Sequence, residues 1–265
     1  MVIACPLAIA QASSQKVLTV TFPYQLSQDI NHEDYYFSQL LRLALDKTVA
    51  QEGPWTYRSH SYWMRDKRLR IGLTRGFVDV IWSPASDDFE QQLLAIKVPL
   101  LKGLSQYRLL LIHEDDQTRF DKIDSLEQLA ALTGGMGSQW PDVSVMEVNG
   151  LKLLTVPGYG RLFKMLAARR FDYFSRGIYQ IQSEVDFYPS LPLAIEKHLL
   201  LKQPGAYYFY VTKENHALAD RIGRGLKLAH KDGSFDELFS SIPRYRWAYH
   251  ELERRGRTLL ELKTP

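Results

Sequence analysis

The chain has 265 residues, 45% of them hydrophobic and 24% charged, which suits one large domain or two lobes of ordinary size. Its net charge of +3 at pH 7 is too small to indicate nucleic acid or a membrane surface as a partner. A single cysteine, Cys5, excludes an internal disulfide and a cysteine-based metal site. No run of 18 apolar residues occurs, so no membrane span is predicted.

The N-terminus reads MVIACPLAIAQASS, an apolar stretch that ends in small residues. Both Ala8–Ala10 and Ala10–Ala12 fit the A-x-A pattern of a signal-peptidase site. We therefore predict that residues 1–15 are the remnant of a secretory signal and that the mature protein is periplasmic. Val2–Cys5 also resembles a lipobox, which would make Cys5 a lipid anchor, and a cytosolic N-terminus is the remaining alternative.

Strands and helices alternate in the first part of the chain. Runs rich in β-branched and aromatic residues predict strands at Lys16–Phe22, Trp55–His60 and Phe77–Trp82. Apolar residues at helical spacing predict helices at Tyr36–Thr48 and Trp63–Thr74. This βαβαβ order favours parallel strands joined by right-handed crossovers, which is an α/β lobe.

A second block of the same kind extends from Thr133 to Gln182, with a glycine loop, a helix, and strands at Leu151–Val156 and Phe171–Phe174. Two long strands, Tyr107–His113 and Tyr207–Thr212, bracket it. A chain that leaves one lobe, builds another and returns needs such paired connections, so we predict two αβα lobes joined by two hinge strands.

The last part of the chain is predicted to return to the first lobe. Helices follow Asn215 and Ser234, another helix covers Arg244–Arg255, and Thr258–Leu262 is a short strand. The predicted division is therefore residues 16–105 and 208–265 for the first lobe and residues 106–207 for the second.

Motifs for catalysis are missing from the sequence. No two histidines lie at metal-binding spacing, and neither a G-x-S-x-G elbow nor a P-loop is present, so we predict no metal, no cofactor and no turnover. Asp79 and Asp172 lie inside apolar strands, and we expect their carboxylates to bond neighbouring backbone or a helix end rather than ligand.

Ligands of α/β sheets bind beyond the carboxyl ends of the strands, and the candidate residues are those expected at that edge. Arg176 is the expected anchor for an anionic ligand group, because its guanidinium matches the two oxygens of a carboxylate. Pairing of Arg176 with Glu184 or Asp172 is the alternative. The other candidates are loop residues, cleft walls and a reserve cation: Tyr24, Trp82, Ser83, Arg108, Gly137, Ser138, Trp140 and Tyr159.

Several short segments resemble the type II periplasmic solute-binding proteins, close to those that serve amino-acid ABC transporters. The segments are Val17–Val20 with Pro23-Tyr24, Leu40–Leu45, Gly76–Val80, Ser125–Leu129 and Met165–Asp172. The resemblance spans nearly the whole mature chain, and it implies two αβ lobes with a ligand in the cleft between them.

Amino-acid binders of this family usually carry an acidic residue soon after the second-lobe strand, whereas this chain has Arg176 there. The arginine often found a few residues after Trp82–Ser86 is also missing. The resemblance thus predicts a monomeric, exported, non-catalytic binding protein for a small polar, anionic, amino-acid-like solute. Its partner would be an inner-membrane permease. The alternatives are a dehydratase-like enzyme on the same scaffold and a periplasmic adaptor for a membrane sensor.

Overall fold

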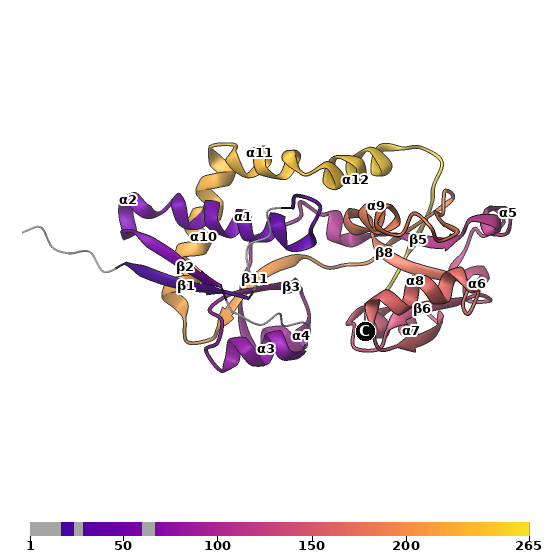
Figure 1. The fold of residues 1–265 in the computed structure, drawn as a ribbon, viewed down its shortest axis with the longest axis horizontal. Helices are drawn as coiled ribbons and strands as arrows, with labels where there is room; N and C mark the ends of the chain where they lie inside the picture. The colour runs from indigo at the N-terminus through magenta and orange to yellow at the C-terminus, as the bar shows by residue number, and fades with distance from the viewer. Residues whose placement is uncertain (1–16, 24–28, 60–66, 265) are drawn as a thin grey trace, which may run out of the picture.

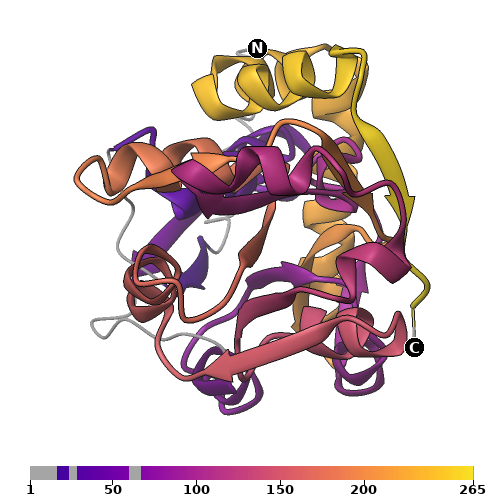
Figure 2. The same cartoon turned by 90° about the vertical axis from the view of Figure 1, so that its right-hand side faces the viewer.

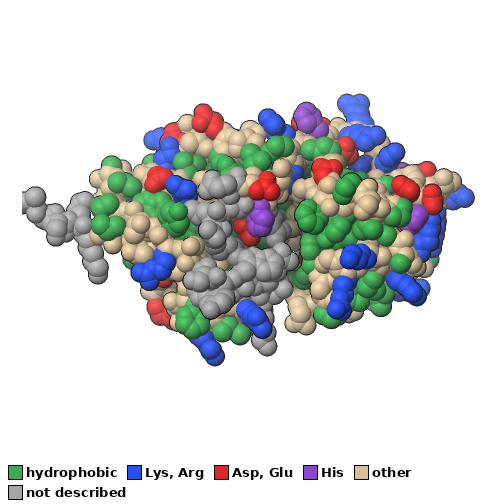
Figure 3. All heavy atoms as spheres, in the orientation of Figure 1, with side chains coloured by type: hydrophobic (Ala, Val, Ile, Leu, Met, Phe, Trp, Pro, Cys, Tyr) green, Lys and Arg blue, Asp and Glu red, His purple; other side chains and the backbone are tan. Residues whose placement is uncertain are grey.

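The structure is a computed structural model that describes residues 17–23, 29–59 and 67–264 (Figure 1). Two groups of strands form the centres of two lobes, and helices cover both faces of each group. The predicted signal remnant, Cys5 and Tyr24 lie outside the described residues. On the face shown in Figure 3, Lys and Arg side chains are scattered over both lobes rather than gathered into a basic patch.

The first lobe contains a parallel pair of strands and a three-stranded antiparallel sheet with β11 in its centre. Its strands are β1 (Leu18–Phe22), β2 (Trp55–Ser59), β3 (Ile81–Pro84), β4 (Leu93–Ile96) and β11 (Tyr207–Thr212). Its helices are α1 (Glu33–Asp46), α2 (Val49–Glu52), α3 (Lys67–Thr74), α4 (Asp87–Gln92), α10 (His216–Lys231) and α11 (Ser234–Ser241). Alternate residues of β11 serve two cores: Phe209 packs with the α1 and α10 side chains, and Tyr210 packs with those of α3 and α4.

The second lobe is built on a sheet with the strand order β12-β10-β5-β8-β6-β7, and β9 pairs with β5 beside this path. Its strands are β5 (Tyr107–His113), β6 (Thr133–Gly137), β7 (Lys152–Val156), β8 (Tyr173–Gly177), β9 (Leu193–Ile195), β10 (Leu199–Lys202) and β12 (Thr258–Glu261). Its helices are α5 (Gln117–Phe120), α6 (Leu126–Leu129), α7 (Asp142–Val148), α8 (Tyr159–Ala167) and α9 (Ile178–Phe187). Leu109 and Leu111 of β5 face the core under α8 and α9, whereas Leu110 and Ile112 face the core under α5 to α7.

Within the described chain, three segments pass between the lobes. Residues 97–106 lead from β4 to β5, and residues 203–206 lead from β10 back to β11. The third crossing consists of α12 (Pro243–Glu253) and residues 254–257, which lead from α11 to β12 along the top of Figure 1. Figure 2 shows this yellow segment descending along the side of the second lobe.

Hydrogen bonds tie the three crossings together. The backbone N–H of Gln203 donates to the carbonyl of Gln106 at 2.9 Å, so the first two crossings run side by side. The hydroxyl of Tyr249 in α12 donates to the carbonyl of Lys102 at 3.1 Å, which joins the third crossing to the first. The predicted hinge strands β5 and β11 begin directly after the first two crossings. Strand β5 belongs to the second-lobe sheet, and β11 belongs to the first-lobe sheet.

Most predicted elements are present in the structure, and the aspartate prediction is confirmed. Asp79 accepts a hydrogen bond from the backbone N–H of Thr21 at 2.6 Å, and Asp172 accepts one from the N–H of Thr133 at 2.7 Å. The helix after Asn215 is capped as expected, since the Asn215 side chain accepts from the N–H of Leu218.

Four details of the prediction were wrong. The third strand begins at Ile81 instead of Phe77, and the segment Thr133–Gly137, expected as a glycine loop, is strand β6. Strand β8 extends to Gly177, so Arg176 lies inside the strand rather than beyond it. Strand β12 pairs with β10 and thus belongs to the sheet of the second lobe, not to the first.

Candidate functional site

Strands β6, β7 and β8 run parallel, and their carboxyl ends meet at one edge of the second-lobe sheet. Helix α7 connects β6 to β7 on one side, and α8 connects β7 to β8 on the other. The direction of the connections therefore reverses at β6, which makes a topological switch point, the place where open α/β sheets bind ligands. Gly137 and Gly177 are the last residues of β6 and β8 at this edge.

Trp140 covers the end of β6. Its ring stacks on Phe174 with the centroids 5.8 Å apart and lies tilted against Tyr159 at 6.2 Å. A Cβ on residue 137 would lie 2.6 Å from the indole ring, so only glycine lets the ring pack on the strand. The backbone N–H of exposed Ser138 donates to the carbonyl of Val156 at 3.1 Å, and the loop after β6 is thereby fixed to β7.

Arg176 is buried, with 5% of its surface exposed, and its guanidinium pairs with Glu184 of α9. Its Nε donates to the two carboxylate oxygens of Glu184 at 3.0 and 2.8 Å, and its Nη2 also donates to Oε1. Three aromatic rings surround the guanidinium carbon: Trp140 at 4.8 Å, Phe174 at 5.0 Å and Tyr159 at 5.4 Å from their centroids. The sequence left two alternatives for Arg176, a ligand anchor or a partner of a nearby carboxylate, and the structure shows the ion pair with Glu184.

Arg108, the second candidate cation for a ligand, also has its hydrogen-bond partners within the protein. It is 6% exposed, and its Nε donates to the hydroxyl of Ser175 at 3.0 Å. Its Nη1 donates to the carboxylate of Asp142 at 3.0 Å, and the amide of Gln203 donates to the same oxygen at 2.7 Å. This network joins the sheet edge to the start of α7 and to the second crossing.

Tyr179, in the first turn of α9, lies between the two lobes. Its ring packs edge-on against Tyr207 of β11 and against Tyr245 of α12. Burial raises the pKa of the Tyr179 hydroxyl well above its usual range, although Arg108 opposes that shift. The hydroxyl is therefore a neutral hydrogen-bonding group at physiological pH.

The first-lobe candidates are more deeply placed than the sequence indicates. Trp82 is 6% exposed, stacks on Phe37, and donates its indole N–H to Asp34 at 3.0 Å. It packs within the first-lobe core, whereas the sequence predicted a cleft wall. Ser83 is half-buried in β3, where it pairs with Tyr208.

The structure thus brings together the second-lobe candidates Gly137, Trp140, Tyr159 and Arg176. Sequence reasoning did not single out Asp142 and Tyr179, and it named Glu184 only as an alternative partner. The Tyr159 hydroxyl, at the start of α8, donates to Glu184 in the second turn of α9 at 2.6 Å. The sequence signal for this group is that both helices directly flank β8 in the chain. No pattern in the sequence marks Asp142 as the partner of Arg108.

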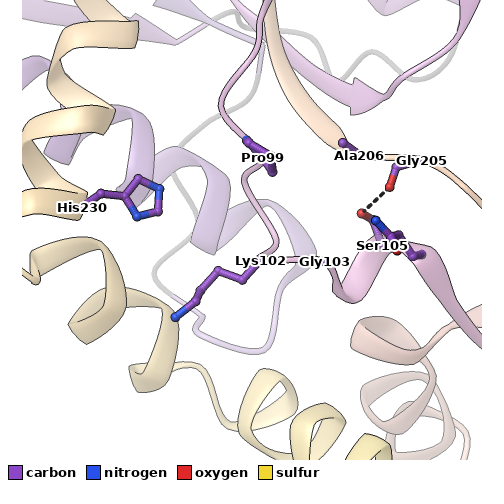
Figure 4. Close-up of a pocket in the computed structure, with 8 residues that line it drawn as sticks. Pro99, Lys102, Gly103, Ser105, Gly205, Ala206 and His230 are labelled. Atoms are coloured by element: carbon purple, nitrogen blue, oxygen red, sulfur yellow. Dashed lines mark hydrogen bonds between the residues drawn. The ribbon is translucent and has the colours of Figure 1, made fainter.

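A surface hollow of about 370 Å³ lies beside the crossings (Figure 4). Lys102 and His230 border it, and the hydroxyl of Ser105 donates across the two crossings to the carbonyl of Gly205 at 3.2 Å. Lys102 is itself paired with Asp236 at 2.6 Å. The hollow contains none of the predicted site residues.

The described residues contain neither a candidate metal site nor a candidate membrane-spanning helix. Their His, Cys, Asp and Glu side chains form no group of three arranged to hold a metal ion. None of the helices between residues 17 and 264 that the structure describes is long and apolar enough to cross a bilayer.

No family model matches this chain, and no curated protein sequence matches it. Solved structures do match. An ancestral arginine-binding protein bound to arginine is 18% identical with a TM-score of 0.61, and the match covers 85% of this chain and 98% of that one. The probable amino-acid ABC transporter extracellular-binding protein ytmK from Bacillus subtilis is 18% identical with a TM-score of 0.62, over 86% and 99%.

A third match is the GluR0 ligand-binding core from Nostoc punctiforme in complex with L-glutamate. It is 12% identical with a TM-score of 0.60, and the match covers 86% of this chain and all of that one. At such identities the agreement concerns the arrangement of helices and strands. The predicted fold class is therefore confirmed: this chain has the two-lobed α/β fold of the type II periplasmic binding proteins.

Proposed function

We propose that this protein is an exported, non-catalytic solute-binding protein that captures a small, polar, amino-acid-like ligand between its lobes. Its partner is an inner-membrane ABC permease, and the protein acts as a monomer. The observation that carries this proposal is the pair of αβ lobes joined by adjacent crossings, an architecture that matches proteins whose descriptions name amino-acid binding or transport.

The switch point of the second-lobe sheet supports a ligand site there. Gly137, Trp140 and Arg176 come from different segments and meet at this edge, the part of an α/β sheet where ligands generally bind. We propose that this edge forms one wall of the ligand cleft and that the ends of β1 and β3 form the other. We propose a second lobe that extends from β5 to β10 and also contains β12, since Tyr207 already belongs to β11 of the first lobe.

The structure supports an anionic ligand less than the sequence does, because the guanidinium of Arg176 already pairs with the carboxylate of Glu184. An amino-acid-like ligand with charges of both signs fits the proposal equally well. The described neighbours are binding proteins, which supports binding without turnover.

The test is a thermal-shift screen of the purified protein against metabolites, with amino acids as the first set. A ligand at a hundredfold excess over Kd should stabilise the folded protein by about 2.7 kcal/mol. For a chain of this size that raises the melting temperature by about 5–10 °C. Mass spectrometry of each mixture after incubation should recover the ligand unchanged and in full. A ligand that is consumed would reject the non-catalytic role.

Small-angle scattering tests the lobed mechanism separately. Saturating ligand should reduce the radius of gyration, because closure of the lobes makes the molecule more compact. An identical scattering profile with and without ligand would contradict closure. The same data report the molecular mass and hence whether the protein is a monomer.

A further inference from the structure

Glu184 is the partner that decides what Arg176 can do. The carboxylate lies in the second turn of α9, is 7% exposed, and receives both the Nε and the Nη2 of Arg176. The hydroxyl of Tyr159, in the first turn of α8, donates to the same carboxylate at 2.6 Å. Helices α8 and α9, which precede and follow β8 in the chain, thereby fix the ion pair in one geometry.

The aromatic rings around Arg176 add to this restraint. The planes of Trp140, Phe174 and Tyr159 lie against the guanidinium at distances typical of cation–π contacts. If Arg176 turned towards a ligand, Glu184 would keep its charge in a buried place with only the tyrosine hydroxyl as a donor. Breaking a buried ion pair in this way is strongly unfavourable, so the pair stays closed.

The charge of Arg108, also at this edge, is neutralised by a carboxylate in the same manner. Arg108 pairs with Asp142, which is 20% exposed in its side chain. Arg176 and Arg108 thus each pair with an internal carboxylate, and the charges of these four residues cancel. Long-range attraction of anions depends on the net local charge. These four residues together add no net charge to the second-lobe wall of the proposed cleft.

We propose that Glu184 is a specificity-determining residue. By pairing with Arg176 at the carboxyl edge of β6 and β8, it prevents the second-lobe wall from selecting ligands with a net negative charge. The site therefore prefers neutral or zwitterionic molecules to their anionic isosteres. The inference rests on the proposed function, because it assumes that the ligand meets the second lobe at this edge.

The consequence is that Glu184→Gln should create an anion site. The variant keeps the shape of the side chain and removes the carboxylate charge that pairs with Arg176, so the net charge at this edge rises by one unit. Inorganic phosphate is the first probe, since arginine binds it with two hydrogen bonds. We expect phosphate to bind Glu184→Gln at least about tenfold more tightly than it binds the wild-type protein, measured by calorimetry and by the phosphate dependence of the melting temperature.

Two variants control this experiment. Glu237→Gln makes the same change in net charge at an exposed position of α11, and it should bind phosphate as weakly as wild type does. Arg176→Gln combined with Glu184→Gln removes both charges, and it should lose the gain. If Glu184→Gln binds phosphate no better than these two controls, Arg176 does not face the site and the inference is rejected.

The wild-type protein provides a second test that does not depend on a variant folding. It is titrated with L-glutamine and with L-glutamate, which have similar shapes and differ in charge, and with phosphate. Preference for either anion over L-glutamine overturns the inference, and the absence of such a preference supports it.

The two proposals fail in different ways. A metabolite screen without any ligand would reject the binding function, whereas a wild-type protein that binds a metabolite, together with a Glu184→Gln variant that gains no phosphate affinity, would reject only the role of Glu184.

Discussion

Helices α1 and α10 approach so closely at Gly225 that a methyl group there should destabilise the first lobe. A Cβ on residue 225 would lie 1.8 Å from the carbonyl oxygen of Ala44 and 2.5 Å from its carbonyl carbon. Both atoms belong to the backbone of α1, so no side-chain rotation relieves the clash and the helices must move apart. Overpacking of this kind costs about 1–3 kcal/mol or more.

The same helix contains a matched control. Gly223 lies two residues earlier in α10, and its Cβ would meet only a methyl group of Ile96 at 3.6 Å, an ordinary contact. Alanine in a helix interior is favoured over glycine by about 1 kcal/mol. We therefore expect Gly223→Ala to stabilise the protein by about 0.5–1 kcal/mol and Gly225→Ala to lower its stability by about 1–2 kcal/mol after the same helix gain is counted.

The difference between the variants is thus about 1.5–3 kcal/mol, or about 3–12 °C in melting temperature for a chain of this length. Calorimetry should assign the shift to the first-lobe transition if the lobes unfold separately. Equal stabilisation by both alanines would show that α1 and α10 do not pack at this distance, and the reasoning would then fail.

Three further changes test other parts of the structure. Arg176→Met leaves the buried Glu184 without its cation and should reduce the free energy of unfolding by about 3–5 kcal/mol, most of which a second change, Glu184→Gln, should restore in urea denaturation. Hydrogen bonding to Lys47 lowers the pKa of Asp232 from 3.8 to about 2, so its stabilisation is complete above pH 3.8 and is lost as the pH falls towards 2. Asp232→Asn should therefore lessen the fall in melting temperature over that range. Leu260→Ala removes a buried side chain of β12 and should cost about 2–5 kcal/mol.

The change at Leu260 has a matched control, and the other two changes each have a result that would contradict them. Leu259→Ala changes the neighbouring residue of β12, which is 47% exposed, and should alter stability by no more than about 0.5 kcal/mol. A pH profile of Asp232→Asn that parallels wild type would contradict the pKa argument. A double variant at positions 176 and 184 that is as unstable as Arg176→Met alone would contradict the ion-pair argument.

The sequence predicted best those elements whose residues signal their own structure. Tyr107–His113 is a run of apolar and β-branched residues, and β5 has these bounds because both of its faces are covered by helices. Asn215 and Ser125 are helix caps whose side chains do what their local positions predict. In such cases the local preference and the tertiary surroundings agree.

Strand β6 shows why other elements escaped prediction. Its residues TGGMG have little side-chain surface and low strand propensity. They form a strand because β7 and β8 pair with them on both sides, and because large rings need the space that glycine leaves. A Cβ on Gly135 would lie 2.2 Å from the ring of Phe171, so the glycine belongs to a packing contact between segments distant in sequence.

Two candidate site residues were misplaced for a similar reason. Arg176 reads as a loop cation because charged residues are seldom buried, yet Glu184 and three aromatic rings make its burial tolerable. Trp82 ends a predicted strand and therefore reads as a cleft residue, but Asp34 accepts its indole N–H inside the first lobe. Neither partner can be recognised from spacing along the chain.

The return of β12 to the second-lobe sheet has a consequence for synthesis on the ribosome. The core beneath α5 to α7 includes Leu260 and Leu262, so the second lobe lacks part of its interior until these residues have left the exit tunnel. The first lobe waits in turn for β11 and α10, which follow strands β5 to β10 of the second lobe in sequence. Neither lobe is a contiguous stretch of the chain, and the lobe begun second is also the one completed last.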